Sequence, residues 1–170
     1  YQRMHVNGIA ILPKGYQHPN MHVSKPYIVY QNVAISLAES NFTIESLDDL
    51  SGKSVAAFQN ARKFLGDDFS KKMAYLMDYR EIADQMKQIS MLYSRSTEVI
   101  VLDSRIFKYF LRENAGQTRY KKAIKIHYIF DERTYSAGFD SKELCEKFDL
   151  GIAKIKEQGI YQQILDKYLK

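Results

Sequence analysis

Apolar segments alternate with amphipathic ones along most of the chain, and this alternation predicts its secondary structure. Runs rich in β-branched and aromatic residues predict strands at residues 9–12, 27–37, 54–58, 74–78, 98–102, 124–130 and 134–139. Apolar residues at helical spacing predict helices at residues 60–73, 80–93, 104–111, 141–159 and 160–169. Strands separated by helices of about ten to fifteen residues indicate parallel β-α-β units, so the expected fold class is α/β.

Composition narrows the class of protein further. Of the 170 residues 45% are hydrophobic and 26% are charged, which is typical of a soluble globular chain and excludes collagen-like and disordered classes. No apolar run approaches the ~20 residues that cross a bilayer. The formal charge is +5, but the basic residues are scattered. Nucleic-acid binding needs a concentrated basic stripe, so we expect no nucleic-acid partner.

The residues that usually carry catalysis or bind metals form no pattern of that kind. Cys145 is the single cysteine, which excludes an internal disulfide, and its place in an amphipathic helix predicts buried packing rather than a nucleophile. The four histidines lack metal-ligand spacing, and none of the 8 glycines belongs to a phosphate-binding motif. We therefore expect no metal, no cofactor and no enzymatic activity.

Four segments, spread in order over most of the chain, carry motifs of a known family. Residues 23–27 read Val-Ser-Lys-Pro-Tyr, and residues 47–57 read Leu-Asp-Asp-Leu-Ser-Gly-Lys-Ser-Val-Ala-Ala. Residues 98–103 read Glu-Val-Ile-Val-Leu-Asp, and residues 151–168 form a helix pair interrupted by Gly-Ile-Tyr. These segments resemble the "FSxPY", "DLKGKxVxV", "vDAVixD" and closing-helix motifs of the bacterial extracellular solute-binding proteins, family 3.

The resemblance implies a type II periplasmic-binding-protein fold, in which two α/β lobes joined by a two-strand hinge hold a ligand between them. We expect a partial lobe 1 with the first hinge strand at residues 1–32 and a complete lobe 2 at residues 33–127. The return hinge strand and the C-terminal helices of lobe 1 are expected at residues 128–170. Two lobes of ~100 residues need more chain than this. Lobe 1 should therefore lack its first two β-α units, as in a fragment, and should expose apolar surface or self-associate through it.

The resemblance also implies where a ligand would bind in lobe 2. The strand-to-helix turn of this lobe consists of Phe58, Gln59, Asn60, Ala61 and Arg62. The start of a helix favours an anion, because its first N–H groups lack partners and the dipole is positive there, and Arg62 would add a charge. The alternative is that Asn60 only caps the helix and that Arg62 is only a surface charge.

Two further positions complete the implied site. Asp103 follows a strand, where the family uses an acid to pair with a ligand's ammonium group; the alternative is a cap for the helix that starts at Ser104. Tyr27 could form an aromatic wall together with Tyr16 and Tyr30, although tyrosines in β segments more often serve packing.

The sequence departs from the family in two places. Members that bind amino acids carry an arginine about seven residues before the serine of "FSxPY", where this chain has Gln17 and His18. The glycine-serine-threonine usual at the lobe 2 turn is replaced by Gln59-Asn60-Ala61. Both departures argue against an ordinary amino-acid ligand.

The resulting hypothesis is a non-catalytic solute-binding protein, periplasmic or otherwise extracytoplasmic, that closes two lobes over a small polar ligand, amino-acid-like or charged. Its partner would be an ABC transporter permease or a membrane sensor. One alternative is a sensor or scaffold domain of this fold with a degenerate ligand site. Another is the effector domain of a cytoplasmic regulator.

Overall fold

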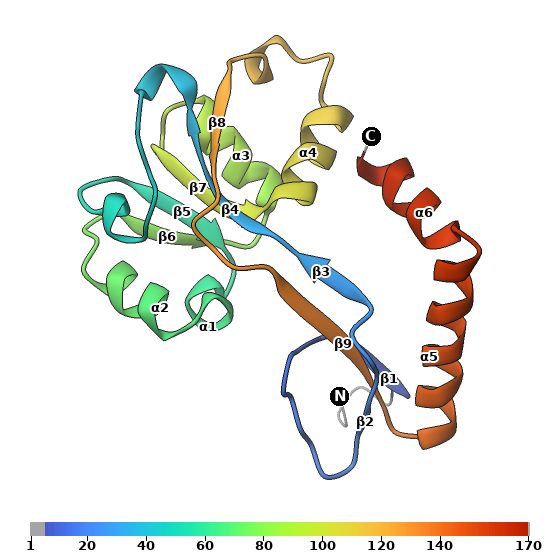
Figure 1. The fold of residues 1–170 in the computed structure, drawn as a ribbon. Coiled ribbons are helices and arrows are strands. Elements are labelled where there is room, and N and C mark those ends of the chain that lie inside the picture. Colours follow the sequence, from blue (N-terminus) through green and yellow to red (C-terminus); the bar gives the residue numbers. More distant parts are fainter. Residues whose placement is uncertain (1–5, 170) are drawn as a thin grey trace. The chain divides into compact units, whose positions relative to one another are not determined.

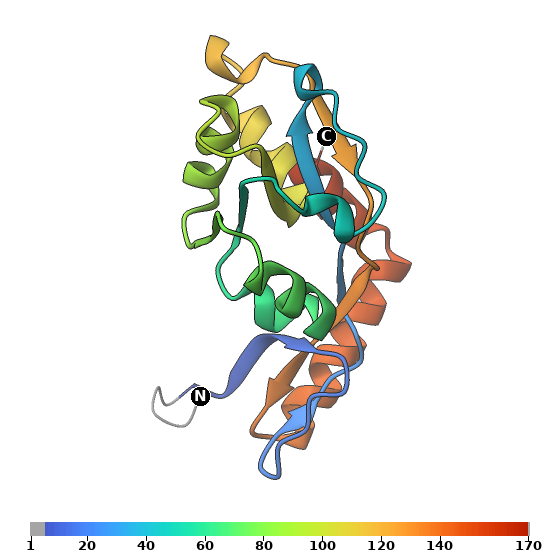
Figure 2. The same cartoon turned by 90° about the vertical axis from the view of Figure 1, so that its left-hand side faces the viewer.

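The chain folds into two compact units and passes between them twice. The computed structural model describes residues 6–169 (Figures 1 and 2). Unit 2 comprises Gln31–Asp131, and unit 1 comprises the segments before and after it, Tyr1–Tyr30 and Glu132–Lys170. Among the described residues, no helix has both the length and the apolar character of a membrane span.

Unit 2 is built on a five-stranded mixed sheet with the order β6-β5-β7-β4-β8. Its strands are β4 (Asn32–Leu37), β5 (Val55–Phe58), β6 (Tyr79–Ile82), β7 (Val99–Asp103) and β8 (Ile124–His127). β5 runs parallel to both β6 and β7, which confirms the expected parallel β-α-β units. β4 runs antiparallel to both of its neighbours, β7 and β8.

Helices cover both faces of this sheet (Figure 1). They are α1 (Ala61–Leu65) and α2 (Asp67–Ala74) on one face, and α3 (Gln85–Tyr93) and α4 (Ser104–Glu113) on the other. Successive residues of a strand point to opposite faces. Val33 and Ile35 of β4 accordingly pack in the core beneath α3 and α4, while Ala34 packs in the core beneath α1 and α2. Unit 2 is thus a three-layer α/β/α sandwich with two hydrophobic cores.

Unit 1 is an antiparallel sheet with two helices. Its strands are β1 (Gly8–Pro13), β2 (His22–Val23), β3 (Ile28–Tyr30) and β9 (Arg133–Phe139), and its helices are α5 (Lys142–Glu157) and α6 (Ile160–Leu169). β9 pairs with each of the other three strands. Phe148 of α5 packs its ring against Phe139 of β9, at 5.2 Å between ring centroids.

Unit 1 exposes most of the large apolar side chains that lie at the surface. Ile9, Ile11 and Val23 of its sheet are each 37% exposed, and Leu150 of α5 is 71% exposed. Both hydrophobic core clusters lie in unit 2. The apolar surface expected on this part of the chain is therefore present. The interpretation of residues 9–12 as a buried strand is wrong, because only Leu12 of these four is buried in the edge strand β1.

Two predicted elements are each divided in two. The strand expected at residues 27–37 forms β3 and β4, which belong to different sheets and are separated by Gln31. The helix expected at residues 60–73 forms α1 and α2 with a break at Gly66, whose φ of 99° and ψ of 173° suit glycine alone.

The segment after α2 differs more from its prediction. The strand expected at residues 74–78 is wrong, since Tyr75 and Met77 are 89% and 105% exposed in a loop and the strand β6 begins at Tyr79. The following helix begins only at Gln85, because the side chain of Asp84 accepts hydrogen bonds from the N–H groups of Met86 and Lys87 at 2.9 and 3.1 Å. A capping residue therefore decided where this helix starts.

Candidate functional site

The turn after β5 and the acid after β7 lie at the same edge of the unit 2 sheet. β5 and β7 are parallel neighbours, and Ala57 pairs with Val101. The next residues along both strands lead to the turn that starts at Phe58 and to Asp103, which ends β7. The tertiary structure thus brings the two groups predicted in lobe 2 to one carboxyl edge, the edge at which open α/β sheets bind ligands.

Glu81 on the neighbouring strand β6 occupies the N–H groups of the turn. Its Oε2 atom accepts the N–H of Asn60 at 2.7 Å, and its Oε1 atom accepts the N–H of Arg62 at 3.0 Å. Asn60 has left-handed backbone angles, φ 63° and ψ 22°, and its side chain makes no capping hydrogen bond. The expectation of an Asn60 side-chain cap is therefore wrong, because the Glu81 carboxylate provides those acceptors instead.

The side chain of Arg62 is engaged within unit 2. Its Nη2 atom donates to the carbonyl oxygen of Met73 at 2.9 Å, and its guanidinium lies over the Tyr79 ring at 4.7 Å from the centroid. The Tyr79 hydroxyl donates to Oε1 of Glu81 at 3.0 Å. Burial, and secondarily the Glu81 charge, raise the pKa of Tyr79, so this hydroxyl stays protonated and donates at neutral pH.

The other residues of the turn differ in accessibility. Ala61 is buried in the core beneath α1 and α2, and Phe58 packs partly against that core. Gln59 is exposed. Among these three, only Gln59 presents a polar side chain to the solvent at the carboxyl edge.

Asp103 caps α4 and is only 4% exposed. Its Oδ1 atom accepts the N–H groups of Arg105 and Ile106 at 2.9 and 3.1 Å, and its Oδ2 atom accepts the N–H of Gln31 at 2.9 Å. Burial raises the pKa of this carboxyl, and the three backbone donors and the Arg105 charge oppose that shift. A carboxylate has about four acceptor positions, so Asp103 can accept one further donor at Oδ2.

Gln31 fastens together the two segments by which the chain enters and leaves unit 2. Its Nε2 atom donates to the carbonyl oxygens of Asn32 and Phe130 at 2.9 and 2.8 Å. Its own carbonyl oxygen accepts the N–H of Ser104 at 2.9 Å. Gln31 is the first residue of unit 2, and Phe130 lies one residue before its end. This role of Gln31 cannot be predicted from the sequence, because its contacts with Asp103 and Phe130 join residues about 70 to 100 positions apart in the chain.

Tyr27 lies in unit 1 and makes packing contacts there. Its ring meets Phe148 edge-on at 5.3 Å between centroids, and its carbonyl oxygen accepts the Tyr161 hydroxyl at 2.7 Å. Burial raises the pKa of Tyr27. Tyr30 stacks at a tilt on Tyr135, at 5.1 Å. These contacts favour the packing interpretation of both tyrosines.

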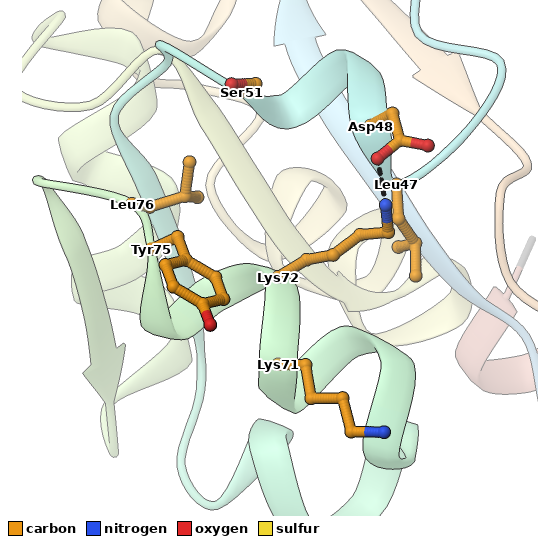
Figure 3. A pocket seen from close by; sticks show the side chains of 7 residues that line it. All are labelled: Leu47, Asp48, Ser51, Lys71, Lys72, Tyr75 and Leu76. Atoms are coloured by element: carbon orange, nitrogen blue, oxygen red, sulfur yellow. Dashed lines mark hydrogen bonds and ion pairs between the residues drawn. The ribbon is translucent and has the colours of Figure 1, made fainter.

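Two open cavities of unit 2 lie away from the predicted residues. One, of about 340 Å³, is lined by Leu47, Asp48, Ser51, Lys71, Lys72, Tyr75 and Leu76 (Figure 3). Lys72 and Asp48 form an ion pair across it. The other, of about 310 Å³, is lined in part by His127. Neither cavity includes a residue of the turn after β5 or Asp103.

His127 is a buried histidine with internal partners. Its Nε2 atom lies 3.0 Å from the Oγ atom of Ser36, which is fully buried in β4. Burial lowers the pKa of His127, and the charge of Lys125 lowers it further. Across residues 6–169 no three His, Cys, Asp or Glu side chains gather into a metal-binding group. Cys145 is buried in α5, as its helical pattern predicted.

Comparisons with known proteins identify the architecture. No family model matches the chain, and neither does any curated protein. Among solved structures, the GluR0 ligand-binding core in complex with L-glutamate is similar, with a TM-score of 0.74 and 15% identity over 99% of this chain and 74% of that one. The arginine-, lysine-, histidine-binding protein ArtJ from Geobacillus stearothermophilus has a TM-score of 0.70 and 18% identity, over 98% and 71% of the two chains.

A third similar structure is a histidine kinase sensor domain with similarity to periplasmic binding proteins. Its TM-score is 0.69 and its identity 18%, over 96% of this chain and 68% of that one. The chain spans 61% to 74% of the length of the solved chains that cover most of it. Likeness at this identity establishes how the chain is folded.

Proposed function

Because the chain has the fold of the family 3 solute-binding proteins, we propose that it is a non-catalytic binding module for a small polar or charged ligand. The observation that carries the proposal is the common carboxyl edge shared by the turn after β5 and by Asp103. Parallel strands end there in a helix start and a carboxylate, the arrangement at which open α/β sheets bind ligands.

Asp103 is proposed to accept a donor from the ligand. Its carboxylate is fixed by three backbone N–H groups and retains one acceptor position on Oδ2. Burial raises its pKa, so a cationic donor there would favour the charged carboxylate and gain a charge-assisted hydrogen bond. Gln59 is an exposed polar side chain of the neighbouring turn and is proposed as a second contact.

The proposed mechanism is closure of two lobes about a two-strand hinge. The lobes are taken as residues 1–32 with 128–170 and residues 33–127, and the chain crosses twice between its two compact units. A ligand that touches both lobes only in the closed state shifts the hinge equilibrium towards closure.

The proposed cellular role is extracytoplasmic, with delivery to an ABC transporter permease or signalling through a membrane sensor. One similar structure is AbpA, an amino acid ABC transporter substrate-binding protein bound to L-arginine, and another is the kinase sensor domain. A further similar protein, AncCDT-1, is an ancestral amino-acid-binding protein and a precursor of cyclohexadienyl dehydratase, so one lineage of this fold is linked to catalysis.

A second candidate function is a sensor or scaffold domain whose ligand site has degenerated. It is favoured by one observation, the occupation of the turn's N–H groups by Glu81. A scaffold of this kind would be stable without a small molecule and would respond to none.

Ligand screening separates the two candidates. The chain is screened by thermal shift against amino acids, polyamines, organic acids and short peptides, and hits are confirmed by calorimetry. A ligand at 100 times its dissociation constant adds about 2.7 kcal/mol to the free energy of unfolding. A hit whose affinity falls in an Asp103→Asn variant supports the binding module, and a screen without hits supports the scaffold.

A further inference from the structure

The open cavity of about 340 Å³ in unit 2 lies on the amino side of the sheet, away from the turn after β5 (Figure 3). One of its walls comes from the segment around η3 (Asp48–Leu50), which precedes β5, and the other comes from the end of α2, which precedes β6. β5 and β6 run parallel, so both strands lead from this side towards the carboxyl edge. A ligand in this cavity would therefore occupy a site separate from Asp103.

Three side chains give the cavity an apolar wall. Leu47 and Leu76 are partly buried and pack against the core beneath α1 and α2, which fixes their positions. Tyr75 is 89% exposed, and within residues 6–169 its ring meets no other aromatic ring and no cation. An exposed aromatic ring beside two leucines offers a surface on which the ring of a ligand can pack.

Two lysines and one aspartate give the lining of the cavity a net charge of +1. Lys72 and Asp48 form an ion pair across the cavity, so these two charges compensate each other. Lys71 is exposed and has no ion-pair partner in the part of the chain described, although Asp67 lies one helical turn before it. The ammonium group of Lys71 is therefore the uncompensated charge of this cavity, and it favours an anionic group on a ligand.

The backbone at the end of α2 is capped by donors from the chain. The carbonyl oxygen of Lys72 accepts the N–H of Tyr75 at 3.1 Å. The carbonyl oxygen of Met73 accepts the N–H of Leu76 at 3.4 Å and Nη2 of Arg62 at 2.9 Å. These donors satisfy carbonyl groups that otherwise make the end of a helix negative, which reduces the repulsion that an anion meets there.

We propose that this cavity is a second binding site of unit 2 and that it takes small aromatic carboxylates. The ring of the ligand packs against Leu47, Tyr75 and Leu76. Its carboxylate pairs with the Lys71 ammonium group and accepts the hydroxyl of Ser51 on the facing wall. The volume lies at the lower end of the roughly 300–1,000 Å³ typical of ligand cavities, which suits a molecule the size of phenylacetate. The inference goes beyond the proposed function, since it concerns other residues and needs no closure of two lobes.

Phenylacetate and two matched compounds test the assignment at neutral pH. Phenylacetamide keeps the ring without the charge, and acetate keeps the charge without the ring. Each is titrated into the whole ¹⁵N-labelled chain, and the backbone NMR signals that shift locate the ligand. We expect phenylacetate to cause saturable shifts at the residues that line the cavity. Phenylacetamide should bind about two- to fivefold more weakly, as the loss of an exposed ion pair implies, and acetate should cause no saturable shift.

Two substitutions separate the contributions of charge and ring. Lys71→Gln should weaken phenylacetate binding about two- to fivefold and remove the preference for the acid over the amide. Tyr75→Ala should weaken the acid and the amide alike, by about two- to tenfold. Both side chains are exposed, so neither variant removes a buried contact that the fold needs.

Two control substitutions should leave phenylacetate binding unchanged. Lys87→Gln removes another exposed lysine of unit 2, on α3, which covers the other face of the sheet. Met77→Ala alters the same loop as Tyr75, at a side chain that is 105% exposed and does not line the cavity.

The NMR signals also keep this inference apart from the proposed function. Saturable phenylacetate shifts confined to the turn after β5 and to Asp103 would overturn the second site and support the proposed function. The second site is also overturned if phenylacetate causes no saturable shift, if the amide binds as tightly as the acid, or if Lys71→Gln binds like the wild type. These last three results leave the proposed function standing, because that function depends on Asp103 and the carboxyl edge.

Discussion

The backbone N–H of Gln31 donates to Oδ2 of Asp103 at 2.9 Å, across 72 positions of sequence. Gln31 is the residue with which the chain enters unit 2, and Asp103 ends β7 at the edge where the candidate site lies. The proposed ligand-binding carboxylate is thus bonded directly to the junction of the two units.

Removing the Gln31 side chain should loosen that junction. Gln31→Ala deletes the donor to the carbonyl oxygens of Asn32 and Phe130 and leaves the backbone bond to Asp103 in place. We expect the free energy of unfolding to fall by about 1–2 kcal/mol, since each such hydrogen bond contributes about 1 kcal/mol. Urea denaturation measures the loss. Gln117→Ala is the control. Gln117 is exposed, and within the part of the chain described its side-chain amide donates only to Oδ1 of Asn114. An equal loss there would contradict a special role for Gln31.

Asp103 should matter for both stability and binding. Asp103→Asn can keep its bonds to Arg105 and Ile106 through the amide oxygen but turns an NH₂ group towards the N–H of Gln31. Because two donors then face each other without an acceptor, we expect the free energy of unfolding to fall by about 1–3 kcal/mol. We also expect a cationic ligand to bind at least tenfold more weakly. Denaturation and calorimetry measure the two effects separately.

Asp84→Asn is the control for this substitution. Asp84 also caps a helix, accepting the N–H groups of Met86 and Lys87, and asparagine is as good a cap as aspartate. Its stability and ligand affinity should stay near those of the wild type. Unchanged cation binding in Asp103→Asn would remove Asp103 from the site.

Stability should fall on mild acidification because of His127. Burial lowers its pKa in the folded state, so the folded chain favours the neutral ring, whereas the unfolded chain protonates it near pH 6.5. The free energy of unfolding should therefore decrease as the pH drops below about 6.5 towards the lower folded pKa. Urea denaturation at pH 7.5 and 5.5 measures the change. A His127→Gln variant should show a smaller difference between the two pH values, and an equal difference would assign the effect to other groups.

Two glycines of unit 1 should respond oppositely to alanine. A Cβ atom at Gly138 of β9 would overlap the Met21 sulfur and come within 2.7 Å of a methyl group of Leu12. Gly138→Ala should therefore lower the free energy of unfolding by about 1–3 kcal/mol. Gly151 lies inside α5 with nothing within 4 Å of such an atom, so Gly151→Ala should stabilise by about 0.5–1 kcal/mol. Thermal denaturation of the pair checks both signs. A stable Gly138→Ala variant would show that Leu12 and Met21 can move aside.

The local parts of the site could be predicted from the sequence. Asp103 caps α4 as its position before an amphipathic helix indicated, and the buried strands β5 and β7 lie where the apolar runs at residues 54–58 and 98–102 placed them. Glu81 could not be found in this way. The sequence interpretation put it in a helix, whereas the structure puts it in β6, and only the pairing of Ala57 with Glu81 brings its carboxylate to the turn.

By itself the sequence determined the α/β class and the order of most elements, because apolar periodicity and helix caps are encoded within a few residues. The candidate site residues came from the resemblance to a family, and the tertiary structure showed that they share one edge of the sheet. The tertiary structure alone decided which groups form hydrogen bonds at that edge of the sheet. Glu81, which accepts the N–H groups of Asn60 and Arg62, lies on another strand, and Gln31, which donates to Asp103, lies 72 positions away in the chain. Contacts across such long stretches of chain leave no local signature. The strand predicted at residues 27–37 is divided at Gln31 for the same reason. Its two halves pair with strands of different sheets, and the residues of the segment alone do not indicate this.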